Sequence, residues 1–138
     1  MPLFSCSGTR PANLGVRDGK LSVCPASPNC VSSDAADDAH AVAPFHLIVA
    51  PGEGWRAART AIDGLPRAQI VSSTDEYLHV ECRSAVFGFV DDLELHLRPQ
   101  EKLIAVRSAA RLGHSDFGVN RKRVEGLRAV LRERGVIR

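Results

Sequence analysis

The chain has 138 residues, of which 44% are hydrophobic and 25% are charged, the proportions of an ordinary globular protein. A chain of this length buries roughly two thirds of the surface it exposes when unfolded. This predicts one domain over residues 1–138 that needs no disulfide or bound metal in order to fold. The longest apolar stretches, such as residues 45–51, are far too short to span a bilayer, so no transmembrane helix is expected.

Charge is distributed unevenly along the chain. Residues 1–97 carry 7 Lys and Arg against 12 Asp and Glu, whereas residues 98–138 carry 11 against 4. A basic C-terminal third could attract phosphates or acidic surfaces. Aromatic residues are not interleaved with the basic ones, as single-strand binding requires, so we expect the two ends of the domain to neutralise each other. A nucleic-acid partner is therefore not expected.

The first 44 residues show no sustained period and are rich in Pro, Gly, Ser, Asn and Asp. This predicts an irregular arm over residues 1–44 that lies on the domain, with residues 34–38 solvated. The N-terminus lacks the charged and apolar regions of a signal peptide, which favours a cytoplasmic protein. Residues 3–6, Leu-Phe-Ser-Cys, look like the end of a lipoprotein cleavage site. A cell-envelope location therefore stays open if an upstream export segment is missing.

Residues 45–138 predict an α+β core. In chain order the patterns indicate a strand (45–49), a helix (about 53–64), a strand (68–72), three alternating strands and a closing helix. The closing helix is capped by Ser115 or Asp116, and Phe117 opens its apolar stripe. The order β-α-β-β-β-β-α predicts an antiparallel sheet of about five strands with two helices packed on one face.

Strict alternation marks the last three strands. Leu78 and Val80 point one way while His79 points the other, and the two following strands repeat this pattern. Period two on three successive runs predicts antiparallel strands with one buried face and one solvated face. On the solvated face, the turn after the second of these runs places Glu94 opposite Arg107, as one step of a charge ladder.

Cys24 and Cys30 enclose five residues that include two prolines, which suits a compact loop whose sulfur atoms could meet. We expect a structural disulfide here under oxidising conditions, with a redox switch or soft-metal site as the alternative. Cys82 occupies an apolar strand position and is expected in the core.

Three carboxylates lie close together at Asp91, Asp92 and Glu94. Asp91 has the parity of the apolar residues, so it points toward the core and must be paired there. Asp92 and Glu94 share the other face. Oxygen ligands of this kind suit a hard cation, but alternate strand residues point to opposite faces, so no metal site is expected.

The strongest candidate for binding runs from Arg107 to Arg121, through a glycine-containing turn into the start of a helix. A helix N-terminus favours anions, and arginines add paired donors for phosphate or carboxylate. The competing interpretation pairs Arg107 with Glu94 and makes Asp116 the helix cap. The candidate binding residues are Arg107, Ser108, Arg111, His114, Asp116, Asn120 and Arg121. No nucleophile elbow, phosphate loop, zinc-protease or dinucleotide motif is present, so no catalytic residue or cofactor is assigned.

Four stretches carry a resemblance: RPANLGV, CPASPNCVSS, FGFVDDLELHL and VRSAARLGHSDFGVNRKRVE, spread from residue 10 to residue 125. With these the chain resembles the domain-of-unknown-function family 1499 of bacteria and plastids. The resemblance implies no established activity, and relatives often carry an N-terminal export or membrane segment. The chain departs from the family pattern at Asp34, where Gln is common, and at Ala110, where Ser is common.

Together these features favour a binding or accessory domain, of the cell envelope in its relatives, whose polar face contacts an anionic small molecule or a partner protein. The alternative is a small enzyme acting on an anionic substrate, for which Ser108, His114 and Asp116 are the nearby candidate groups. A pocket lined by Arg107, Arg111 and Asn120 with His114 aimed into it would favour the enzyme.

Overall fold

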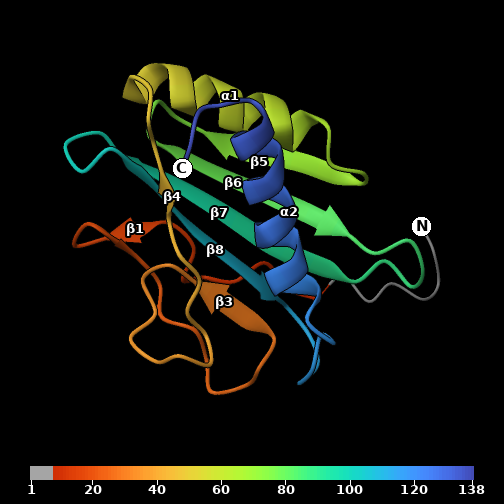
Figure 1. Ribbon diagram of the computed structural model, residues 1–138. Coiled ribbons are helices and arrows are strands. Elements are labelled where there is room, and N and C mark those ends of the chain that lie inside the picture. Colours follow the sequence, from red (N-terminus) through yellow and green to blue (C-terminus); the bar gives the residue numbers. More distant parts are fainter. Residues whose placement is uncertain (1–7) are drawn as a thin grey trace.

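One antiparallel sheet organises the molecule, and its strands follow the spatial order β3-β8-β7-β6-β5, with β4 also pairing with β8. The structure is a computed structural model that describes residues 8–138 (Figure 1). The sheet strands are β3 (Cys30–Ser32), β4 (Phe45–His46), β5 (Ala68–Ser73), β6 (Tyr77–Arg83), β7 (Val90–Arg98) and β8 (Leu103–Ala110). The last four are sequential hairpins, which confirms the predicted strand order. The sixth strand is β3, which lies inside the predicted irregular arm.

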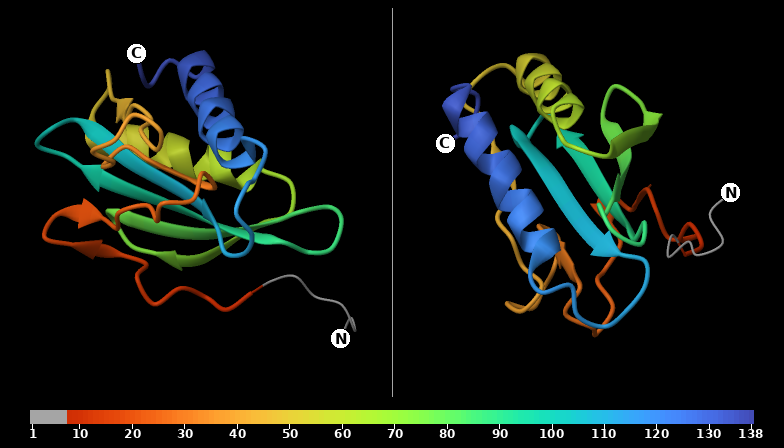
Figure 2. Two further views of the ribbon diagram at one scale, coloured as in Figure 1. Left: turned by 90° about the horizontal axis from the view of Figure 1, so that it is seen from below. Right: turned by 90° about the vertical axis from the view of Figure 1, so that its right-hand side faces the viewer.

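Two helices, α1 (Pro51–Asp63) and α2 (Val119–Glu133), lie on one face of this sheet (Figures 1 and 2). The α+β class, the antiparallel sheet and the two helices are thus as predicted. The start of the closing helix differs, because α2 begins only after Gly118. Phe117 therefore does not join the apolar stripe, and its side chain is 88% exposed.

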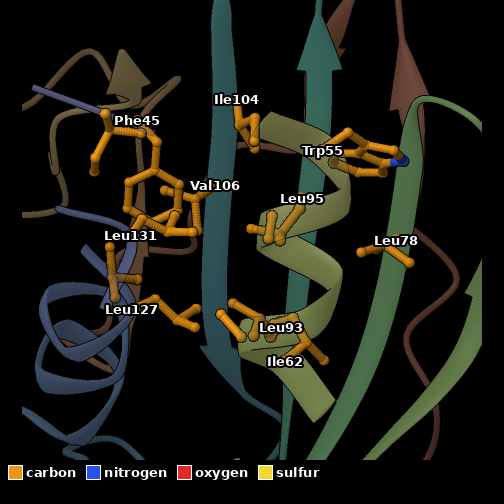
Figure 3. Close-up of a cluster of buried hydrophobic side chains, with 14 of the residues drawn as sticks. Phe45, Trp55, Ile62, Leu78, Leu93, Leu95, Ile104, Val106, Leu127 and Leu131 are labelled. Carbon is orange, nitrogen blue, oxygen red and sulfur yellow. The ribbon is translucent and has the colours of Figure 1, made fainter. Parts of the chain in front are cut away.

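The core fills the space between the helices and the sheet (Figure 3). Alternate residues of β6, β7 and β8 point toward the helices and meet side chains spaced along α1 and α2. These buried side chains include Phe45, Trp55, Ile62, Leu78, Leu93, Leu95, Ile104, Val106, Leu127 and Leu131. Cys82 is also buried here as a free thiol, as predicted. Burial raises the pKa of its thiol, so it behaves as a small apolar residue.

The first part of the N-terminal arm, through Val23, lies on the other side of the sheet from the helices (Figure 2), whereas carbonyls within residues 39–44 accept hydrogen bonds from Arg121 and Arg128 of α2. Most of it is irregular, but it contains a two-stranded hairpin of β1 (Val16–Arg17) and β2 (Lys20–Leu21). The hairpin turn is Asp18-Gly19, with φ of 53° and 77°. Two left-handed residues in a row give the turn type whose twist matches antiparallel strands. The Leu-Phe-Ser-Cys stretch at residues 3–6 lies outside the described residues.

Asp34 is not solvated, because it accepts hydrogen bonds of 2.9 and 2.6 Å from Arg98 and one of 2.9 Å from the amide of Leu21. The expectation for residues 34–38 is therefore wrong at its first residue, while Asp37 and Asp38 are exposed. Over residues 8–138, neither helix has the length and hydropathy needed to cross a membrane.

Candidate functional site

The sheet face beneath the arm carries a cluster of charged and polar side chains. Strand pairing brings these residues together: His79 is opposite Glu94, Glu94 is opposite Arg107, and Glu81 is opposite Asp92. Directly opposite residues share a face of an antiparallel sheet, so three strands contribute to one surface. The cluster, called the polar layer below, consists of His79, Glu81, Asp92, Glu94, Arg107 and Arg111.

The polar layer is buried, so the prediction of a solvated sheet face is wrong. Asp92 is 1% exposed, Glu94 is fully buried and Arg107 is 3% exposed. The cause is the arm, which is hydrogen-bonded across this face. The amide of Gly15 donates to Glu94 at 2.7 Å, and Arg10 donates to Glu81 at 2.7 and 2.9 Å.

Arg111 is the centre of the ion pairs in the layer. Its guanidinium donates two hydrogen bonds of 2.8 Å to the two oxygens of Asp92 and one of 2.5 Å to Glu81. His79 lies on the other side of Asp92, at 2.7 Å. Burial alone would raise the pKa values of Asp92 and Glu81, but their hydrogen bonds to Arg111 and to their second partners outweigh it and lower both.

A metal ion would need the same carboxylates. Ligand atoms of His79, Glu81 and Asp92 lie within 4.8 Å of one another. Arg111 occupies the space between the two carboxylates and neutralises them, so a cation would have to displace a buried guanidinium. Asp91 cannot contribute, because it points to the helix side. There it pairs with Arg123 at 2.9 Å, as its predicted burial requires.

Arg107 and Glu94 form a less complete pair. Their predicted cross-strand register is confirmed, and Arg107 Nη1 lies 3.7 Å from Glu94 Oε1. Glu94 Oε2 accepts hydrogen bonds from Gly15 and, at 2.5 Å, from the hydroxyl of Tyr77, whereas the buried Oε1 has no hydrogen-bond partner among residues 8–138. Burial and the neighbouring Glu94 carboxylate raise the pKa of Tyr77, so its hydroxyl remains a donor.

Arg107 also binds the arm. Its Nε donates to the carbonyl of Ser22 at 2.9 Å and its Nη2 to that of Val23 at 3.2 Å, while Nη1 makes no hydrogen bond within the described part of the chain. Burial lowers the pKa of the guanidinium, and the attraction of Glu94 only partly opposes this. Arg107 is therefore a buried positive charge that its surroundings compensate incompletely.

A hollow of about 330 Å³ opens beside these two arginines. Its floor is formed by Asp92, Arg107, Ala109 and Arg111, and its walls come from the arm. The wall residues include Pro11, Asn13, Val23, Cys24 and Pro25. A second hollow of about 420 Å³ lies on the other side of the arm, with Arg10, Tyr77 and His79 in its lining.

A disulfide fixes one wall of the first hollow. Cys24 and Cys30 are bonded, with their Cα atoms 5.7 Å apart, which confirms the predicted pairing. Cys30 belongs to β3, which pairs with β8 opposite Ala109. The disulfide therefore ties the segment that contains Val23 and Pro25 to β3, the neighbour of the strand β8 that carries Arg107.

The predicted binding residues divide between the two faces of the sheet. Arg107 and Arg111 line the hollow, but Ser108 points to the helix side and donates to Asn120 at 2.6 Å. The N-cap of α2 is Gly118, without a side-chain cap, so the predicted cap at Ser115 or Asp116 is wrong, although Asp116 accepts hydrogen bonds from the amides of Gly118 and Asn120. Arg121 donates to the carbonyls of Ala39 and Ala41, and His114 is exposed.

Comparison with known proteins gives a family. The family model described as "Protein of unknown function (DUF1499)" matches residues 20–131, most of the chain. The chain belongs to this family. No curated protein and no solved structure matches the chain. The DUF1499 match includes every residue of the polar layer and both cysteines of the disulfide, and it begins after Arg10 and Gly15.

The sequence did not point to four participants in this cluster: Arg10, Tyr77, His79 and Glu81. The alternation had already placed His79 and Glu81 on the face of Asp92 and Glu94, so the signal was present. It was read as a solvated surface, because nothing in the periodicity of β6 and β7 indicates that an irregular segment covers them. The charges themselves were the remaining clue, since opposite charges on neighbouring strands can satisfy one another when buried.

Proposed function

We propose that this domain is a binding module that holds a small organic anion in the hollow beside Arg107 and Arg111. The observation that carries the proposal is the state of Arg107. It is a buried guanidinium whose Nη1 has no hydrogen-bond partner among residues 8–138, and whose carboxylate neighbour lies at 3.7 Å. A carboxylate or phosphate in the hollow would supply the missing acceptor through charge-assisted hydrogen bonds.

The lining favours a ligand with a short apolar part beside its charge. Pro11, Val23, Pro25 and Ala109 contribute apolar surface, and about 330 Å³ is at the small end of ligand sites. A partner protein is the weaker candidate, because the arm already covers the polar layer and leaves only small openings to it.

Binding rather than catalysis is proposed because of where the candidate reactive groups lie. Neither Ser108, His114 nor Asp116 lines the hollow, and Asn120 lies on the opposite side of the sheet. A small enzyme would be favoured if His114 pointed into a pocket beside the arginines. His114 does not line the hollow that Arg107 and Arg111 line.

We also propose that the domain works in an oxidising compartment such as the cell envelope. The Cys24–Cys30 disulfide supports this, because structural disulfides persist outside the reducing cytosol. Alkylation of free thiols in intact cells, followed by mass spectrometry, tests it. Protection of both cysteines supports the proposal, and alkylation of both contradicts it.

The binding proposal is tested at Val23, an 80% exposed residue at the edge of the hollow. Thermal-shift titrations with small carboxylates and phosphate esters should find an anion that stabilises the native state by mass action. Val23→Glu should weaken binding of the anion several-fold at low salt, through repulsion across the hollow. Val23→Lys should strengthen binding of the anion, through attraction. Val23→Gln is the matched neutral control and should bind as the wild type does.

A variant in the floor gives the larger effect. Arg107→Gln should weaken binding roughly ten- to a hundredfold, the worth of a charge-assisted contact of about 1.5–3 kcal/mol. If no anion raises the melting temperature, or if the Glu and Lys variants at position 23 bind equally well, the hollow is not an anion site.

A further inference from the structure

Exposed apolar side chains are concentrated at one end of the sheet. Of the eleven large hydrophobic residues exposed among residues 8–138, six lie in the β6–β7 connection, the β8–α2 connection or the first residue of α2. These six, called the apolar tips, are Val86, Phe87, Phe89, Leu112, Phe117 and Val119. The other five are scattered over the remaining surface.

The two connections leave the same end of neighbouring strands. Ala110 at the end of β8 pairs with Asp91 at the start of β7, and the amide of Arg111 donates to the carbonyl of Val90 at 3.2 Å. Figure 1 shows the β6–β7 and β8–α2 connections leaving this end of the sheet. The apolar tips therefore form two convex projections from one end of the molecule.

Each projection carries a phenylalanine in a backbone conformation that a bulky residue rarely adopts. Phe87 has a φ of 65° and is 68% exposed, and Phe117 has a φ of 53° and is 88% exposed. A glycine with positive φ follows each of them, at Gly88 and Gly118. Asn or Gly suits a left-handed residue better, so neither phenylalanine is explained by the stability of its turn. An exposed, strained aromatic at each tip points to an apolar environment outside the folded chain.

The charges around the apolar tips are mostly positive. Residues 83–90 and 111–123 contain five Arg and Lys and a single acid, Asp116, although Arg111 and Arg123 are paired with Asp92 and Asp91 of β7. Asp116 is already engaged by the amides of Gly118 and Asn120. Arg83 has a side chain that is 46% exposed, and Lys122 is exposed on the first turn of α2.

We propose that the apolar tips dock on the surface of a bilayer that contains anionic phospholipid. Phe87 and Phe117 would enter the boundary between headgroups and acyl chains, and Arg83 and Lys122 would lie at the level of the headgroup phosphates. Apolar and aromatic side chains beside basic ones are the combination that binds such interfaces. A bilayer fits better than a protein partner, because the tips project outward and line neither hollow of the described chain.

Vesicle flotation of the whole chain tests the proposal, with phosphatidylcholine vesicles and with vesicles that also contain phosphatidylglycerol. We expect the wild type to bind the anionic vesicles more tightly, with binding falling as salt is added. Phe87→Asn and Phe117→Asn should each reduce binding roughly ten- to a hundredfold, the worth of burying a phenylalanine. Neither should lower the melting temperature, because Asn tolerates positive φ.

Matched controls distinguish a specific membrane-binding site from nonspecific adsorption to the vesicles. Ile48→Asn removes an apolar side chain that is 55% exposed outside the tips, and it should leave binding unchanged. Lys122→Gln should weaken binding about fivefold, whereas Lys102→Gln, in the β7–β8 turn at the other end of the sheet, should have no effect. Three results would overturn the proposal: no flotation of the wild type with either vesicle, equal losses for Ile48→Asn, or self-association of the chain that Phe87→Asn abolishes.

Discussion

One face of the sheet is covered by two helices and the other by an arm that is only partly regular, yet both faces are buried. On the helix side, Leu78, Leu93 and Val106 meet other apolar side chains, and burial itself supplies the stabilisation. On the arm side, the residues of the same strands are charged, and their burial is tolerated only because each carboxylate meets a guanidinium or a hydrogen-bond donor. A polar face that alternates with an apolar one is therefore not always a solvated face.

The two kinds of burial should respond differently to the loss of one side chain. Arg111→Ala leaves Glu81 and Asp92 buried without their shared cation, which should lower the free energy of unfolding by about 3–5 kcal/mol. Leu93→Ala on the opposite face should cost about 2–5 kcal/mol, through lost contacts and a cavity. Urea denaturation measures both losses.

Arg83→Ala is the matched control, because this half-exposed arginine lies 3.8 Å from the same Glu81. It should cost no more than about 1 kcal/mol, as surface pairs do. If Arg111→Ala costs as little as Arg83→Ala, the polar layer is open to water and the comparison between the faces fails.

The second contrast concerns the arm, which the disulfide anchors, whereas no disulfide holds the helices. Cys24→Ser with Cys30→Ser should lower the free energy of unfolding by about 2 kcal/mol in the chain-entropy description of so short a loop. Hydrogen exchange should speed up at the amides of Gly15 and Leu21, which donate to Glu94 and Asp34, more than at amides of α1. Equal acceleration in the arm and in α1 would show that the arm is no separate unit.

A third contrast is in pH dependence. The pKa values of Asp92 and Glu81 are lowered in the folded chain, so the stabilisation they give is complete above their unfolded pKa, near 4, and is lost as the pH falls through their folded values. The loss should be smaller than for Arg111→Ala, since a protonated carboxyl still accepts a hydrogen bond.

Unfolding free energies measured from pH 6 down to pH 2 give the test, with Asp92→Asn as the comparison. The variant should lose stability less steeply with acid than the wild type does. Parallel curves for the two proteins would mean that Asp92 contributes nothing to acid sensitivity.

Much of the fold could be predicted because its signals are local. Strict alternation located β6, β7 and β8 and even set Glu94 opposite Arg107, and apolar spacing located both helices. The burial of the polar layer depends on contacts such as Gly15 with Glu94, across 79 residues, which no periodicity encodes. Strand parity, a local signal, is enough to place Ser108 on the opposite face from Arg107, whereas the contact of Asn120 with Ser108 is long-range and no periodicity encodes it.

The most direct test of the account is a nitrogen-15 spectrum of the arginine Nε–H groups, recorded with and without the anion selected by thermal shift. Arg107 Nε is buried and bonded to the carbonyl of Ser22, so its proton should exchange slowly with water and give a resolved signal at neutral pH. We expect the signals of Arg107 and Arg111 to shift and saturate as the anion is added, while that of Arg128, which is buried on the helix side and donates through Nε to Glu125 at 2.8 Å, stays in place. Fast exchange at Arg107, or saturable binding that leaves both signals unchanged, would contradict the account.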